Sequence, residues 1–178
     1  MLIVLTGGAR SGKSSLALKL AERPGLPVTF VATCPRIDGD TELDQRIGAH
    51  RAERPAEWTT VEAEHDLAAA LQQVDDTATV VIDCLTLWVS NLLHRGDDAA
   101  AIDDAGREVI TAIAARAGQT IAVTNEVGLG IVPADPLSRA YRDALGQMNQ
   151  AWVAAADRAL FLVAGKAIAL RDPDELLP

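Results

Sequence analysis

A glycine-rich segment near the start of the chain carries the residue types of a phosphate-binding loop. Residues 7–14 read GGARSGKS and fit the pattern G-x-x-x-x-G-K-[ST]. In such a loop the backbone N–H groups point at phosphate oxygens, while the lysine and the last hydroxyl, here Lys13 and Ser14, reach the terminal phosphates and Mg²⁺. An apolar run at 2–6 predicts a buried strand before the loop, and apolar residues at helical spacing follow it. We therefore expect a nucleoside triphosphate to contact Gly7, Gly8, Ala9, Arg10, Ser11, Gly12, Lys13 and Ser14.

An acidic residue ends a second apolar run. Asp83 closes the predicted strand at 77–83, where a phosphate-loop enzyme places the carboxylate that holds Mg²⁺, directly or through water. The same residue could instead cap the helix that begins near Leu85. The two roles are compatible.

A basic helix precedes Pro55. Arg46, His50 and Arg54 are spaced four residues apart and Arg51 adjoins them, so a helix would place them on one face. A bound polyphosphate would relieve the repulsion between the arginines, and a neutral imidazole among them could attack phosphorus. The alternative is a solvated helix face with intrahelical ion pairs, and spacing alone favours that alternative.

The segment 125–133 follows another predicted strand and holds two glycines. It could be a mobile substrate loop in which Glu126 accepts a hydroxyl proton or contacts an amide. It could equally be a strand-end turn whose apolar residues pack, and the pattern does not separate these readings. His65 and His94 lack partners at metal-ligand spacing, so no zinc site is expected.

These residues need a scaffold, and apolar runs alternating with amphipathic segments predict one. We expect a single α/β domain over 1–178, P-loop NTPase-like and RecA-like, with a mostly parallel sheet, helices on both faces and a C-terminal antiparallel strand. The predicted strands are 2–6, 28–33, 77–83, 119–124, 158–163 and 167–170, with a short extended piece at 58–61 and the last two strands joined at Gly165-Lys166. The predicted helices follow the loop at 7–14 and span 41–54 (capped by Asp40 or Thr41), 66–74, 85–94, 99–117 and 137–156.

Parallel strands place the ligand beyond their carboxyl ends. The segments after Thr6, Thr33, Asp83 and Thr124 all leave the predicted sheet from that edge. They should therefore converge on one site.

Composition limits the partners. The chain has 178 residues, a formal net charge of −9 and 3% aromatic residues. An acidic chain lacks the clustered basic residues that nucleic acid requires. No apolar run approaches the length of a membrane span, and Cys34 and Cys84 are expected to be thiols in a reducing cytoplasm.

Taken together, the motifs resemble one family, the bifunctional adenosylcobinamide kinase / adenosylcobinamide-phosphate guanylyltransferases of cobalamin biosynthesis. The resemblance covers nearly the whole chain, in order, and the histidine helix and the Asn-Glu-Val-Gly segment are far more specific than the phosphate loop. It rests on residues 6–14, 31–33, 46–47, 50–51, 54–55, 58, 83–86, 91–93, 124–133, 139, 142–143, 146, 149–150 and 156–157.

This resemblance implies two reactions. A nucleoside triphosphate, ATP or GTP, phosphorylates the aminopropanol hydroxyl of adenosylcobinamide with Mg²⁺, and GTP then donates GMP to that phosphate. The GMP passes through a covalent histidine adduct, which the resemblance places on His50, against the reading from spacing alone. The family is also homotrimeric. Its nucleotide contacts carry over to residues 7–14 and to Ala32, Thr33, Cys34, Arg51, Ala52, Glu53, Arg54, Glu62 and Asp83. The chain departs from the family pattern at 166–170.

Two alternatives remain from other readings of the motifs. A phosphate-loop kinase of a small alcohol would have only the first activity. A nucleotide-binding switch would act through a partner, but guanine-selective switches usually carry an Asn-Lys-x-Asp run, which residues 124–127 do not form. Because the two reactions attack different phosphorus atoms, we also hypothesise that the histidine helix swings, with Gly39 and Gly48 as hinges.

Overall fold

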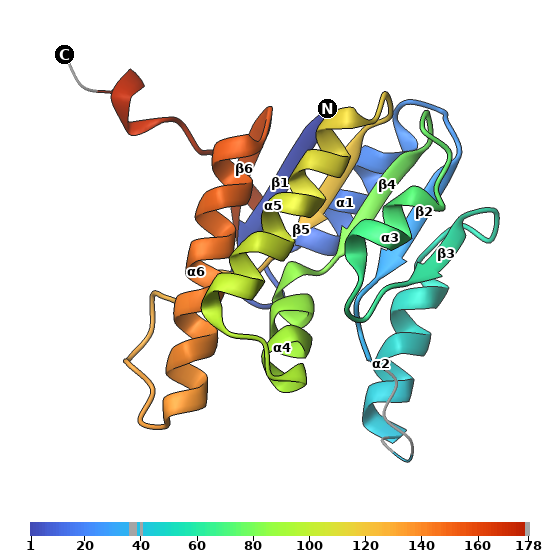
Figure 1. The fold of residues 1–178 in the computed structure, drawn as a ribbon. Helices are drawn as coiled ribbons and strands as arrows, with labels where there is room; N and C mark the ends of the chain where they lie inside the picture. The colour runs from blue at the N-terminus through green and yellow to red at the C-terminus, as the bar shows by residue number, and fades with distance from the viewer. Residues whose placement is uncertain (36–38, 40, 177–178) are drawn as a thin grey trace.

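One seven-stranded sheet organises the chain (Figure 1). The structure is a computed structural model that describes residues 1–35, 39 and 41–176. The strands are β1 (Leu2–Gly7), β2 (Val28–Ala32), β3 (Thr59–Glu62), β4 (Thr79–Asp83), β5 (Thr120–Val123), β6 (Arg158–Val163) and β7 (Lys166–Ala169). The helices are α1 (Lys13–Glu22), α2 (Thr41–Ala52), α3 (Leu67–Gln72), α4 (Leu85–Arg95), α5 (Ala99–Ala115) and α6 (Pro136–Ala155), with a 3₁₀ turn at Pro173–Glu175.

The strand order is β3-β2-β4-β5-β1-β6-β7. Every neighbouring pair is parallel except β6 and β7, which are antiparallel. The mostly parallel sheet and the C-terminal antiparallel strand are therefore confirmed. Because β5 lies between β1 and β4, the segments that follow these three strands leave from one edge of the sheet.

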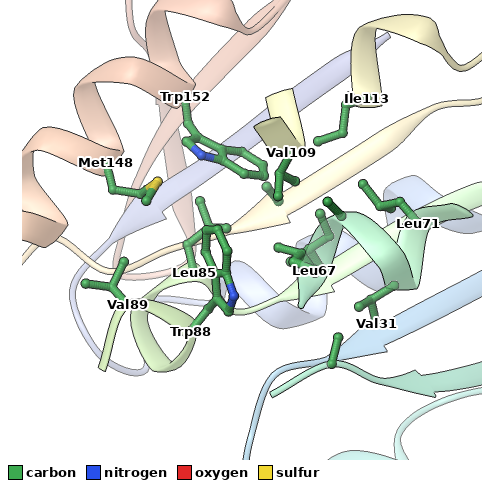
Figure 2. Close-up of a cluster of buried hydrophobic side chains, with 14 of the residues drawn as sticks. Val31, Leu67, Leu71, Leu85, Trp88, Val89, Val109, Ile113, Met148 and Trp152 are labelled. Atoms are coloured by element: carbon green, nitrogen blue, oxygen red, sulfur yellow. The ribbon is translucent and has the colours of Figure 1, made fainter. Parts of the chain in front are cut away.

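Two hydrophobic layers cover the sheet, as predicted. Helix α1 covers one face, where its alanines pack on strand residues such as Leu5 and Ile121. Helices α3, α4, α5 and α6 cover the other face. Figure 2 shows this larger cluster, in which Trp88 and Trp152 are the largest fully buried side chains. Burial of a large apolar side chain such as leucine or phenylalanine stabilises a fold by roughly 1.5–3 kcal/mol, so this cluster contributes substantially to stability.

Helix α2 projects beyond the carboxyl edge, below β2 and β3 in Figure 1. It ends at Ala52, so the prediction that Arg54 shares its face is wrong. A proline disfavours helical backbone in the residue before it, and Arg54 instead closes a turn by donating its N–H to the Arg51 carbonyl. Thr41 is the first helical residue, and the other predicted cap, Asp40, lies outside the described residues.

One alternative reading and one further local prediction are wrong. The residue that caps α4 is Cys84, in extended conformation, and not Asp83, which belongs to β4. The β6–β7 hairpin turns at Ala164 and Gly165 rather than at Gly165-Lys166, since Val163 pairs directly with Lys166. Ala164 and Gly165 both have positive φ angles, 50° and 75°, as two-residue hairpin turns of type I′ require.

Replacing Gly7 with alanine should destabilise the protein by about 2–6 kcal/mol, because steric overlap and backbone strain each cost about 1–3 kcal/mol. A Cβ atom there would lie 2.2 Å from the Leu162 carbonyl oxygen, and φ is +144°. Urea unfolding measures the loss. In the control, Gly146→Ala in α6, the added Cβ meets no heavy atom of the described residues within 4 Å, and alanine should stabilise the helix by up to about 1 kcal/mol. Equal stability of the Gly7 variant and the parent would contradict this reason for the glycine.

Candidate nucleotide site at the carboxyl edge of the sheet

The predicted phosphate loop connects β1 directly to α1. Gly12, with φ at 99°, precedes the first turn of α1, so the helix N-terminus opens toward the loop, where an anion is favoured. The Lys13 ammonium lies inside the loop and donates to the carbonyl oxygens of Gly7 (3.1 Å) and Gly8 (2.7 Å). Lys13 is only 6% exposed, and this burial lowers its pKa. Gly8, Ala9 and Arg10 are exposed, so the outer side of the loop is open to a ligand.

The C-terminal hairpin supports the phosphate loop from the side. The Gly165 N–H donates to the Ser11 carbonyl oxygen at 3.0 Å. A Cβ on Gly12 would lie 3.4 Å from the Gly165 Cα, so the two backbones pass close to each other. Sequence reasoning missed this contact, because its partners lie near opposite ends of the chain and no local pattern marks it.

Strand register places Glu62 and Asp83, two acidic residues predicted to contact the nucleotide, in one row across the sheet. Ala32 of β2 pairs with Glu62 on one side and with Asp83 on the other, and Asp83 pairs with Val123 of β5. Paired residues point to the same face, and Val123 belongs to the layer under α1. Asp83 therefore faces the side on which Lys13 begins α1, and its negative charge counteracts the lowering of the Lys13 pKa.

The donor set at this edge fits Mg²⁺ of the kind that accompanies a nucleotide. Such an ion keeps several waters and takes one or two carboxylates plus phosphate oxygens from the substrate. The chain would supply the Ser14 hydroxyl and the Asp83 carboxylate. Within the described ranges no group of three or more His, Cys, Asp and Glu side chains could hold a metal by itself.

A buried hydrogen-bond network fixes the ends of β2, β3 and β4. The Thr33 hydroxyl donates to the Cys84 carbonyl (2.7 Å) and accepts from the Cys84 N–H (2.8 Å). The Asn91 amide of α4 donates to the carbonyls of Thr33 (2.8 Å) and Glu64 (3.0 Å). Asn91 therefore positions the strand ends that carry the acids. The sequence contained Asn91 in a family motif but gave no signal of this role.

The thiol of Cys84 should react with a disulfide reagent such as DTNB far more slowly than an ordinary thiol. Burial, reinforced by the Asp83 carboxylate, raises the pKa of Cys84 from 9.0 to about 12, which lowers its thiolate fraction at pH 8 about a thousandfold. The Cys34→Ser variant, which keeps Cys84, should therefore react slowly, and its rate should rise with pH above 9. The Cys84→Ser variant, which keeps Cys34, is the control. Equal rates at pH 8 would contradict the prediction.

Arg54 lies in the segment that connects the end of α2 to β3. Its guanidinium lies over the Phe30 ring, 3.9 Å from the ring centre, and donates to the Thr60 hydroxyl at 3.2 Å. Burial and the charge of Arg51 lower the pKa of Arg54, while Asp83 opposes this shift. The charges of Arg54 and Asp83 therefore interact. Arg51, Ala52 and Glu53 beside it are exposed.

His50 lies two residues before the end of α2, and its side chain and that of Arg46 lie outside the described part of the chain. The backbone that carries His50 nevertheless belongs to a helix at the same edge as the phosphate loop (Figure 1). The prediction that the imidazole reaches a bound nucleotide stays a prediction.

The segment after β5 begins beside the phosphate loop. The Glu126 N–H donates to the Gly7 carbonyl at 3.1 Å, and the Asn125 N–H donates to the Thr86 hydroxyl at 2.8 Å. The buried Asn149 side chain accepts from the Thr124 hydroxyl (2.7 Å) and donates to the Asn125 carbonyl (2.9 Å). The Glu126 carboxylate accepts from the Gly128 N–H, so it orders the loop, a role that sequence reasoning did not assign.

The structure thus brings most of the predicted contacts to one edge. They are the loop at 7–14, the ends of β2, β3 and β4 with Ala32, Thr33, Cys34, Glu62 and Asp83, and the segment 51–54. His65 and His94 take no part in this cluster: the His94 ring bonds to Ser90 on its own helix, and His65 lies beside Glu64. Among the described residues, none of the helices has the length and apolar character needed to cross a lipid bilayer.

Solved structures share this fold. A Pyrococcus horikoshii protein, PH0250, aligns with a TM-score of 0.57 at 9% identity, over 97% of this chain and 86% of that chain. The RadB recombinase aligns with a TM-score of 0.52 at 16% identity, over 90% of this chain and 73% of that one. At these identities the likeness concerns the fold alone, which is of the RecA-like P-loop NTPase type, as predicted.

Curated relatives are much more similar in sequence. The chain is 42% identical over 94% of its length to the bifunctional adenosylcobalamin biosynthesis protein CobP of Pseudomonas aeruginosa, covering 96% of that protein. It is 36% identical to the Salmonella typhimurium bifunctional adenosylcobalamin biosynthesis protein CobU, over 96% of this chain and all of that protein. The model of one family matches residues 3–170. The chain therefore belongs to the cobinamide kinase / cobinamide phosphate guanyltransferase family.

Proposed function

We propose that this chain phosphorylates adenosylcobinamide and then converts the product to adenosylcobinamide-GDP with GTP. The observation that carries the proposal is the arrangement at the carboxyl edge: a buried Lys13 inside the phosphate loop, the Asp83 carboxylate near it, and the helix that contains His50 at the same edge. Family membership supports both activities, because the relatives are named as bifunctional.

In the first reaction, the alcohol oxygen of the substrate attacks the γ-phosphorus of ATP or GTP. The bond to the bridging oxygen breaks, the nucleoside diphosphate leaves, and the hydroxyl proton is released. The N–H groups of the loop and the Lys13 ammonium hold the phosphates and neutralise charge that develops in the transition state. Ser14 and Asp83 would hold Mg²⁺, which supplies further neutralisation of the phosphate oxygens.

In the second reaction, an imidazole nitrogen of His50 attacks the α-phosphorus of GTP and pyrophosphate leaves. An oxygen of adenosylcobinamide phosphate then attacks the guanylyl phosphorus, the phosphorus–nitrogen bond breaks, and His50 is regenerated. The exposed residues Arg51, Ala52 and Glu53, with Arg54, would contact the nucleotide, as would Ala32, Thr33, Cys34 and Glu62 at the strand ends.

Because the α- and γ-phosphorus atoms differ in position, either α2 or the nucleotide must move between the reactions. Gly39, with φ at 84°, precedes α2, and Gly48 within it has room around its Cα, which supports the hinge hypothesis. Crosslinking α2 in place should abolish guanylylation. Activity that survives the crosslink would remove the need for this motion.

We further propose that the chain acts as a single nucleotide-binding domain, in a homotrimer, in the cytoplasm. Family resemblance supports the trimer. The acidic charge of −9 supports small-molecule substrates over nucleic acid.

Product analysis tests the proposed function. Wild-type protein incubated with adenosylcobinamide, GTP and Mg²⁺ should yield adenosylcobinamide phosphate and then adenosylcobinamide-GDP with pyrophosphate. Formation of the phosphate alone would indicate the single-activity kinase. Slow GTP hydrolysis without any corrinoid product would favour the nucleotide switch.

A further inference from the structure

The loop between β5 and α6 exposes an unusual number of large apolar side chains. Leu129 is 82% exposed, Ile131 97%, Val132 61% and Leu137 54%. These four residues, named here the apolar loop surface, lie within nine consecutive positions. Isolated exposed apolar residues are common, but several gathered in one segment mark a binding surface.

The apolar loop surface belongs to an ordered segment and not to a frayed one. The Asp135 carboxylate accepts from the Ser138 N–H at 2.8 Å and caps α6. The Arg139 guanidinium donates to the carbonyls of Pro133 (3.0 Å) and Ala134 (2.6 Å). Together with the Glu126 contact to Gly128, these bonds hold the backbone while the apolar side chains point away from the core. The fold therefore maintains this exposure.

The position of the loop indicates what covers it. The Glu126 N–H near its start donates to the carbonyl of Gly7, and the loop follows β5, which lies between the phosphate-loop strand and the strand of Asp83. An acceptor that receives the γ-phosphate must bind beside these groups. Figure 1 shows the loop, in orange, extending outward beside the first turns of α6, so the segment that starts beside the phosphate loop also carries the apolar side chains.

A hollow extends this surface between α4 and α6. Its volume is about 190 Å³, and it is lined by Ser90, Leu93, His94, Leu137, Ser138 and Tyr141. Leu137 belongs to both the hollow and the apolar loop surface. The lining combines apolar side chains with hydroxyl and imidazole groups, which suits a ligand that has apolar faces and amide groups at its rim.

We propose that the apolar loop surface docks the corrin ring of the cobinamide substrate and directs its alcohol toward the phosphate loop. This inference rests on the proposed function and adds to it the site of the acceptor. A corrin ring is a broad macrocycle with apolar faces and amide-bearing side chains, so it matches both the exposed leucine, isoleucine and valine and the mixed hollow beside them.

The double substitution Leu129→Ser with Ile131→Ser tests the proposal. Adenosylcobinamide binding is measured by equilibrium dialysis, and the KM for adenosylcobinamide is measured in the phosphorylation reaction. We expect the Kd and the KM for adenosylcobinamide both to rise at least about tenfold, since two large apolar contacts are lost. The Kd for GTP should stay within about twofold. The control is Leu26→Ser, an apolar residue 45% exposed just before β2, at the opposite edge of the sheet, and it should change neither constant.

Each outcome is decisive. Unchanged corrinoid binding in the double variant, with a wild type that still makes both products, would overturn the docking site and leave the proposed function intact. A wild type that neither binds nor converts adenosylcobinamide would overturn the proposed function itself. If sedimentation shows that the double variant forms a smaller oligomer than the wild type does, the apolar loop surface is a contact between copies of the chain, and the docking proposal is wrong.

Discussion

The Lys13→Ala variant should lose both activities, each by about 10²- to 10³-fold, the usual consequence of removing one preorganised charge from a transition state. The Lys13 ammonium lies inside the phosphate loop, where it donates to the carbonyl oxygens of Gly7 and Gly8, and the proposed function places the triphosphate of either nucleotide in this loop. In the proposed mechanism both reactions use a triphosphate in this loop, so both should fail together. Initial rates of phosphate and GDP-derivative formation measure the effect.

The control for this variant is Lys19→Ala. Lys19 lies on the same helix but is exposed, so its removal should leave both rates within about twofold, as expected for a surface residue. Thermal unfolding of both variants separates a catalytic loss from a folding loss. A Lys13→Ala protein that folds normally and keeps either activity at the parent rate would contradict the placement of the triphosphate in this loop.

The His50→Ala variant should phosphorylate adenosylcobinamide at close to the parent rate and then stop. Without the imidazole, the guanylyl group has no nucleophile to carry it, so the phosphorylated intermediate should accumulate and GDP-derivative formation should fall at least about 10³-fold. Chromatography of the corrinoid products over time measures this. The variant thus separates two activities that the Lys13 variant removes together.

His65→Ala is the matched control, because His65 lies in another loop at the same edge and beside Glu64. It should give the full product sequence. A His65 variant that accumulates the intermediate, or a His50 variant that does not, would show that another group carries the guanylyl transfer.

Local signals were enough to predict most of the fold. The phosphate loop and the apolar strands depend on residues close in sequence. The carboxyl-edge location of the site followed from parallel strands alone. Errors occurred at boundaries, where neighbours compete: the proline at 55 shortened α2, and the direct pairing of Val163 with Lys166 moved the last turn by one residue.

Contacts between distant segments could not be predicted in the same way. The bond from Gly165 to Ser11 and the position of Arg54 over Phe30 join elements that meet only in the folded chain. The two hydrogen bonds from the Asn91 amide to the ends of β2 and β3 also join distant segments. An asparagine within a helix usually signals nothing about its partners. The apolar loop surface had two readings in sequence, substrate loop or packed turn, and the exposure of Ile131 excludes packing of that side chain.

The most direct measurement is the position of the covalent label after incubation with GTP that carries a labelled α-phosphate. If a triphosphate in the Gly7–Ser14 loop comes within reach of the imidazole at the end of α2, peptide mapping should find the label on His50, stable in alkali and lost in acid. Label on any other residue, or an enzyme that makes adenosylcobinamide-GDP without ever becoming labelled, would contradict this account.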